Sequence, residues 1–192
     1  MSKKFVDLFA GCGGLSLGME KAGFTVAFAS DIDPICSNTY IKNRPLDKPL
    51  ACLCADLEQI NQICELNDKA KILIKEFLPG PLTLILKAQE KVEKMIGYKT
   101  IGVRIPDCEV ALDILKEHGP MLTTSVNDSG KTPINEYGQI VNEYADLVDE
   151  IYKPTSNSSN LSSTVVNLTN DKVEVLRQGA ITLLDINKVL NV

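Results

Sequence analysis

Hydrophobic and polar positions follow two different periods along this chain, and the changes of period predict the order of its elements. Short apolar runs bounded by Gly, Pro, Asn or Asp are typical of strands, whereas apolar residues that recur every three or four positions indicate helices. The pattern predicts strands at 5–9, 25–29, 50–55, 82–86, 100–105, 121–124, 163–168 and 173–176. It predicts helices at 14–22, 34–43, 57–66, 68–77, 109–118 and 135–144. This mixture indicates an α/β (α+β) fold.

Polar residues and glycines mark several of the predicted boundaries. Asp56, with Gln59 three positions later, is typical of a helix N-cap with a reciprocal side chain. The segment Pro79-Gly-Pro81 stops the preceding helix and opens an apolar run that indicates a buried strand. His118 precedes Gly119 at a predicted helix end, where a cation favours the helix dipole, and we prefer this interpretation to a catalytic one.

Composition narrows the class of protein. A chain of 192 residues, 44% hydrophobic and 23% charged, has the length and composition of one soluble domain. It contains no run near the roughly 20 apolar residues of a membrane span, and its start lacks a secretory signal, so we expect a cytoplasmic protein. Six cysteines without a CxxC pair and a single His argue against zinc and favour reduced thiols.

Charge narrows the class of partner. The formal net charge of −5 argues against binding to a DNA duplex, since proteins that grip nucleic acid usually present a basic face. Several cations nevertheless stand beside Gly, Pro, Ser or Asn: Lys42, Arg44, Lys48, Arg104, Lys131 and Arg177. A small phosphate ligand such as a nucleotide could meet several of them at once.

The N-terminal segment carries one recognisable motif. A strand runs into Asp7-Leu-Phe-Ala-Gly-Cys-Gly-Gly14, and glycines there would let backbone amides approach a ligand. Asp31 follows the next strand, where a carboxylate can accept hydrogen bonds from ribose hydroxyls. Residues 5–43 resemble the start of the cytosine-5 DNA methyltransferases, a Rossmann-like β-α-β-α segment. The resemblance implies S-adenosylmethionine binding by Phe9, Gly11, Gly13 and Asp31.

The machinery for methyl transfer is missing from the sequence. Those enzymes need a Pro-Cys nucleophile, a Glu-Asn-Val segment and a target-recognition region, and the chain has none of them. We therefore do not expect DNA methylation. Two interpretations stay open, a scaffold with an empty or altered ligand shelf and a residual S-adenosylmethionine site.

A second set of motifs is spread over the rest of the chain. It comprises Lys42-Asn-Arg44, Gly102-Val-Arg104-Ile-Pro, Ser125-Val-Asn127, Ser163-Thr and Arg177. Residues at i and i+2 of an extended segment leave the same face, so both members of a pair can reach one ligand. Taken singly, each motif has a structural alternative: a solvated helix end, an ordinary turn or a surface ion pair.

In this order the motifs resemble the YrdC-like threonylcarbamoyl-AMP synthases over residues 40–183. The resemblance implies a twisted mixed sheet flanked by helices and the conversion of ATP, L-threonine and bicarbonate to threonylcarbamoyl-AMP and pyrophosphate, with Mg²⁺. It implies that Lys42 and Arg44 stabilise the phosphates, while Ser125 and Asn127 position the reacting groups. Ser163 and Arg177 would hold the nucleotide, supported by Arg104. A separate transferase would pass the product to tRNA.

The sequence departs from that family at one place. Members carry a Pro-Thr-Asp-Thr-x-Tyr-Gly-Leu-like loop before Lys-x-Arg, and residues 24–33 replace it here, so the activity could be impaired. We expect residues 1–43 to pack into the same domain as the YrdC-like residues 40–192. The alternatives are a non-catalytic nucleotide- or RNA-binding module of the same fold, a methyltransferase fragment that binds S-adenosylmethionine, or a chance gene fusion.

Overall fold

The computed structural model of the chain describes residues 4–7, 19–29, 51–126, 133–153, 162–170 and 172–191, with backbone alone for 4–7 and 25–29. The chain divides into two compact units. One unit contains 1–49 and 87–100, and the other contains 50–86 and 101–192. Of the predicted elements, the helix at 34–43 lies outside the described residues.

The first unit contains a parallel strand pair. β1 (Lys4–Asp7) pairs with β2 (Thr25–Ala29), and the register shifts between Phe5 and Val6. A helical turn precedes β2 and ends at Gly23, whose φ of 86° favours glycine. Strand, helical turn and parallel strand follow one another as predicted for a β-α-β segment. The same unit contains α5 (Glu90–Ile96), which ends at Gly97 with a φ of 76°.

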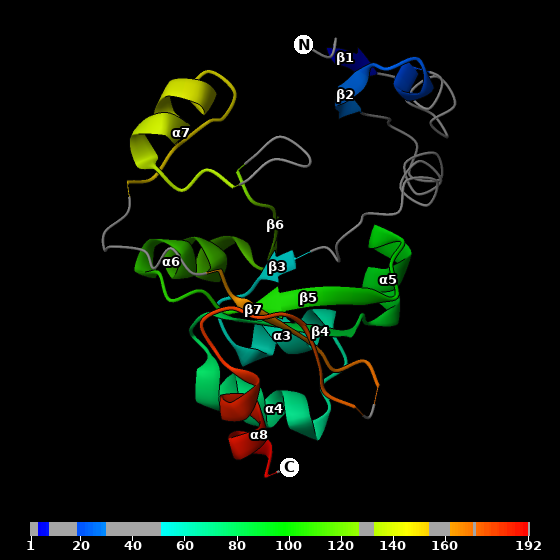
Figure 1. The fold of residues 1–192 in the computed structure, drawn as a ribbon, viewed down its shortest axis with the longest axis vertical. Helices are drawn as coiled ribbons and strands as arrows, with labels where there is room; N and C mark the ends of the chain where they lie inside the picture. The colour runs from blue at the N-terminus through cyan, green and yellow to red at the C-terminus, as the bar shows by residue number, and fades with distance from the viewer. Residues whose placement is uncertain are drawn as a thin grey trace. The chain divides into compact units, whose positions relative to one another are not determined.

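A six-stranded mixed sheet forms the centre of the fold (Figure 1), and its strand order is β6-β3-β5-β4-β7-β8. β3 pairs in parallel with β5, and β4 with β7, whereas β6 and β8 are antiparallel to their neighbours. The strands are β3 (Ala51–Leu53), β4 (Leu82–Lys87), β5 (Thr100–Arg104), β6 (Met121–Thr123), β7 (Thr164–Asn167) and β8 (Glu174–Arg177).

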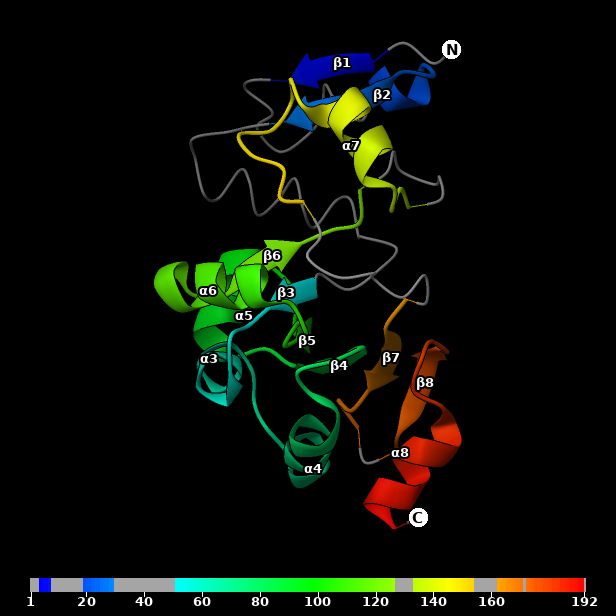
Figure 2. The same cartoon turned by 90° about the vertical axis from the view of Figure 1, so that its left-hand side faces the viewer.

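Five helices of the second unit accompany this sheet within the described residues. They are α3 (Leu57–Ile63), α4 (Asp68–Phe77), α6 (Glu109–His118), α7 (Tyr137–Tyr144) and α8 (Leu183–Leu190). Helices α4 and α8 lie side by side in both views (Figures 1 and 2). The side-chain amide of Asn67, the N-cap residue of α4, donates to the carbonyl of Leu168 (2.9 Å) and links that helix to the end of β7.

The core is centred on β4, which is buried at five consecutive positions from 82 to 86. Burial on both faces explains why this strand reads as a continuous apolar run. Helix α4 contributes Ala70, Leu73 and Ile74, and α8 contributes Ile186. β8, at the edge of the sheet, is mostly exposed. The well-buried centre holds the strand ends in fixed positions.

The helix caps agree with the sequence with one correction. Asp56 accepts from the backbone N–H of Gln59 (2.9 Å), as predicted. The reciprocal bond is different: the Gln59 side-chain oxygen accepts from Ala55 (2.8 Å), and its amide donates to the carbonyl of Leu115 (2.7 Å). Gln59 therefore links α3 to the end of α6, a role that depends on a residue distant in sequence. Helix α6 ends at His118, as predicted.

Most element predictions are confirmed to within one or two residues, and α4 and α6 have the predicted bounds. The helix predicted to reach 66 ends at Ile63, because Cys64 adopts an extended conformation. The helix predicted from 135 begins at Tyr137. Two helices were not predicted, α5 and α8. Helix α8 has a capping box of Thr182 and Asp185 that is readable in the sequence.

The described cysteines are free thiols. Cys52, Cys54 and Cys64 are buried, whereas Cys108 is exposed. Burial raises the pKa of the Cys64 thiol to about 12, so this group stays protonated at neutral pH. Within the described residues, no cluster of His, Cys, Asp or Glu could hold a metal ion, and no helix is long and apolar enough to cross a membrane.

Candidate functional site

Four strands meet at one end of the sheet. Arg104 ends β5, Arg177 ends β8, and Ser163 immediately precedes β7. β7 and β4 start together because they are parallel, and the bond from the Gly80 N–H to the Ile105 carbonyl (3.0 Å) joins the start of β4 to the end of β5. The sheet topology thus brings together three predicted site residues that are far apart in sequence.

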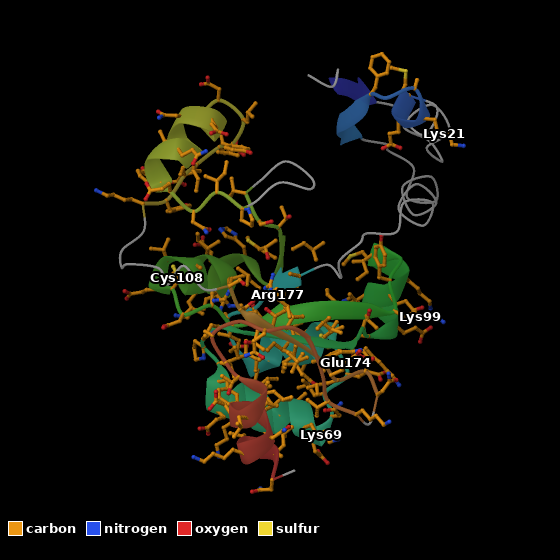
Figure 3. The ribbon with its side chains drawn as sticks, in the orientation of Figure 1. Lys21, Lys69, Lys99, Cys108, Glu174 and Arg177 are labelled. Carbon is orange, nitrogen blue, oxygen red and sulfur yellow. The ribbon has the colours of Figure 1, made fainter. Side chains whose placement is uncertain are left out.

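Arg177 is bound to Ser163 through both backbone and side chain. Its Nε and Nη2 donate to the Ser163 carbonyl at 3.1 and 2.9 Å, and Nη2 also donates to Ser163 Oγ at 3.1 Å. Arg177, labelled in Figure 3, is exposed at the end of the edge strand β8. In the described part of the chain it forms no ion pair, so the surface ion pair considered for it is not found there. These bonds orient the guanidinium.

Besides Arg177, the Ser163 hydroxyl contacts a second side chain, the hydroxyl of Thr83, which the sequence analysis did not identify. Thr83 Oγ1 lies 2.9 Å from Ser163 Oγ, and the two side chains are 9% and 7% exposed. The sequence contains a feature that could have identified Thr83. In Pro79-Gly-Pro81-Leu-Thr83, the threonine is the second residue of a strand predicted to be buried. A polar residue in a buried strand needs a partner. The sequence shows the need for this partner and not its identity.

Arg104 supplies a second cation. Its Nε donates to the Gly80 carbonyl (2.8 Å), and the residue is half-buried. Loss of hydration lowers the pKa of Arg104, and the nearby charge of Arg177 lowers it further against the opposing effect of Asp107. Neither arginine forms a salt bridge with a described carboxylate. Two neighbouring cations of this kind favour an anionic ligand.

A buried hydroxyl holds the chain that follows Arg177. Thr164 Oγ1 donates to the Ile181 carbonyl (2.6 Å) and accepts from the N–H groups of Gly179 and Ile181, both at 3.0 Å. A Cβ at Gly179 would lie 2.2 Å from the Ser162 carbonyl oxygen, so the close approach requires glycine. The turn after β8 is therefore packed directly against the start of β7.

The other predicted residues are only partly described. Ser125 is exposed and follows β6, and its neighbour Val126 accepts from the N–H of Ile134 (2.8 Å). The structure describes neither its predicted companion Asn127 nor the pair Lys42 and Arg44. The residues assigned to S-adenosylmethionine also lie outside the described ranges: Phe9, Gly11, Gly13 and Asp31.

A mixed sheet flanked by helices, with two arginines at one end, defines the class as an α/β protein whose strand ends suit an anionic ligand. The sequence profile of the Sua5/YciO/YrdC family, described as telomere recombination, matches residues 27–179. The chain belongs to this family. The match does not include residues 1–26, and the comparisons do not show the methyltransferase resemblance of the N-terminal segment.

Similar proteins carry a consistent name. A putative threonylcarbamoyl-AMP synthase of Methanocaldococcus jannaschii is 34% identical over 74% of this chain and 68% of its own. The threonylcarbamoyl-AMP synthase of Pyrococcus abyssi is 33% identical over 78% of this chain, which spans about half (45%) of that longer protein. These names support the predicted synthase type and do not favour the alternatives.

Solved structures agree with the predicted fold. P. abyssi Sua5 complexed with L-threonine matches with a TM-score of 0.70 and 30% identity, over 84% of this chain and 49% of that chain. Escherichia coli YciO matches with a TM-score of 0.66 over 97% of this chain and all of its own, and at 23% identity it supports the fold alone. The prediction of a mixed sheet flanked by helices is confirmed.

Proposed function

We propose that this chain is a threonylcarbamoyl-AMP synthase, which uses ATP, L-threonine and bicarbonate and releases pyrophosphate. The observation that carries the proposal is the cluster of Arg104, Ser163 and Arg177 at one end of the sheet, in a chain whose relatives carry this name. Two neighbouring cations and an oriented hydroxyl suit a nucleotide phosphate or ribose. That P. abyssi Sua5 forms a complex with L-threonine supports the choice of amino acid.

The chemistry depends on alignment and charge neutralisation. The amino nitrogen of threonine bonds to the carbon of bicarbonate with loss of water and gives an N-carboxy-threonine. Its carboxylate oxygen then bonds to the α-phosphorus of ATP as the bond to pyrophosphate breaks. In the proposal, Lys42 and Arg44 neutralise the phosphates, while Ser125 and Asn127 position the α-phosphate and the carboxylate. In this proposal Mg²⁺ would accompany ATP, whose phosphate oxygens bind the ion.

Arg177 and Ser163 would hold the nucleotide in this scheme, and Arg104 would add positive charge beside them. The Arg177 guanidinium is already oriented by the Ser163 carbonyl, so it loses little freedom when a ligand binds. Residues 1–43 would pack into the same domain as 40–192. The product would pass to a separate transferase that modifies tRNA, and the proposal includes a cytoplasmic location for the reaction.

The test is pyrophosphate release from ATP, measured with and without threonine and bicarbonate. We expect release only when both are present, and we expect Lys42→Ala to abolish it. Lys75→Ala, which removes an exposed lysine of α4, is the matched control and should retain activity. Stabilisation by ATP without threonine-dependent release would refute the synthase and favour a non-catalytic binding module.

We propose separately that the N-terminal segment retains a binding site for S-adenosylmethionine. The parallel pairing of β1 and β2 around a helical turn favours it, because this is the strand arrangement that such a shelf requires. Calorimetry with S-adenosylmethionine tests it. Saturable binding that is lost in Asp31→Ala supports the proposed site. Absence of binding to the unsubstituted protein refutes it.

A further inference from the structure

The buried hydroxyl pair of Thr83 and Ser163 joins two parallel strands at the cationic end of the sheet. Thr83 belongs to β4, and Ser163 immediately precedes β7. Their oxygens are 2.9 Å apart, and either one could be the donor. Which one donates decides where the remaining hydroxyl proton lies.

Each hydroxyl has one proton and two acceptor positions. Ser163 Oγ already accepts from Arg177 Nη2 at 3.1 Å. If Ser163 donated to Thr83, the Thr83 proton would be buried without a partner, because within the described residues Ser163 is the one hydrogen-bond partner of the Thr83 hydroxyl. An unpaired buried donor is costly. The two residues are about equally buried, so with Thr83 as donor the unpaired proton is that of Ser163; it lies beside Arg177, where a ligand bound to the arginines can accept it.

With Thr83 as donor, Ser163 Oγ accepts two hydrogen bonds, from Thr83 and from Arg177. Both of its acceptor positions are then occupied, and its own proton remains available beside the exposed guanidinium. A hydroxyl in this state is a donor and not an acceptor. Next to two arginines it complements an anionic or oxygen-rich ligand.

We propose that Thr83 is a positioning residue that fixes the Ser163 hydroxyl as a hydrogen-bond donor to the bound nucleotide. The inference rests on the proposed function for the identity of that ligand. Thr83 touches no ligand in this scheme and acts through Ser163. Its effect must therefore disappear when the Ser163 hydroxyl is removed.

The experiment is a double-mutant cycle with ATP as the probe, read by calorimetry on the full chain. We expect Thr83→Val, which keeps the shape and removes the hydroxyl, to weaken ATP binding about 5- to 10-fold, since the loss of one ordinary hydrogen bond gives an effect of this order. Thr83→Ser should restore binding. In the Ser163→Ala background, Thr83→Val should change the affinity less than about 2-fold, the usual additivity limit of such cycles.

Several controls separate positioning from packing. Thr100→Val makes the same change at the start of β5, four residues before Arg104, and should leave ATP binding unchanged. In assays of the active enzyme, Thr83→Val should raise the KM for ATP and leave the KM for threonine unchanged. If Thr83→Val does not fold, as judged by its circular dichroism, Thr83→Ala takes its place in the same cycle.

Two results would overturn the inference: ATP affinity unchanged in Thr83→Val, or an equal loss in the Ser163→Ala background. Neither depends on catalysis. Suppose that the unsubstituted protein binds ATP and the cycle shows coupling between Thr83 and Ser163, but no pyrophosphate is released with threonine. The synthase proposal then fails and the positioning role stands. If it is active and the cycle shows no coupling, the positioning role alone fails.

Discussion

Thr164 is the residue at which the structure makes its sharpest stability prediction. Its side chain is fully buried, and its hydroxyl makes three hydrogen bonds to the turn that follows β8. Thr164→Val keeps the shape of the side chain and removes all three bonds. The N–H of Ile181, a residue only 8% exposed, is then left without a partner, whereas its carbonyl still accepts from the Gln178 side-chain amide (2.9 Å).

The magnitude follows from that lost partner. An unsatisfied buried group costs ~1–3 kcal/mol, so the N–H of Ile181 predicts a loss of about 1–3 kcal/mol in the free energy of unfolding. The Gly179 N–H is half-exposed, so water can replace its partner at little cost. Because a domain is stable by about 5–15 kcal/mol, the variant should unfold at clearly lower denaturant concentration.

The assay is urea unfolding followed by far-ultraviolet circular dichroism, because the chain contains no tryptophan to report by fluorescence. Thr164→Ser is the matched control: it keeps the hydroxyl and removes one buried methyl group, which costs about 1 kcal/mol. A loss in Thr164→Val no larger than that in Thr164→Ser would refute the hydrogen-bond accounting.

Two further predictions concern single positions. Gly179→Ala places a methyl group against the Ser162 carbonyl and should lower the thermal midpoint, whereas Gly138→Ala, with no atom near its Cβ, should raise helix stability by about 0.5–1 kcal/mol. Equal effects of the two would contradict the steric argument. The hydrogen bond from the Thr182 side chain, followed by that from its backbone, lowers the pKa of Asp185 below its ordinary 3.8. The stabilisation by Asp185 is then present above that pH and lost as pH falls through the lower folded-state value. Asp185→Ala should therefore destabilise the protein at pH 7 and cease to differ from the unsubstituted protein in strong acid; a difference independent of pH would contradict this linkage.

Local patterns in the sequence were sufficient for most of the fold. The apolar run from 82 to 86 predicted a buried strand, and the apolar spacing from 68 to 77 predicted α4 with the bounds that the structure has. Short elements were harder to predict from the sequence. Helix α5 has seven residues and buries only Val92 and Ile96, too few positions to establish a helical period.

Candidate site residues could be recognised one motif at a time, and their arrangement could not. Arg104, Ser163 and Arg177 were singled out from their sequence contexts, whereas Thr83 was passed over as part of a strand. Its partner Ser163 is 80 positions away in the chain. No local pattern encodes a contact at that separation, because it exists only after β4 and β7 have paired.

The family, the order of most elements and the residue types that suit a nucleotide could all be read from the amino-acid sequence. These properties depend on local spacing and on motifs that stay in order along the chain. Only the tertiary structure decided that Arg104 lies near Arg177, that Arg177 is oriented by Ser163, and that the serine hydroxyl is shared with Thr83. The physical reason is that strand pairing sets which ends of distant segments meet, and hydrogen-bond geometry then sets which atoms face a ligand.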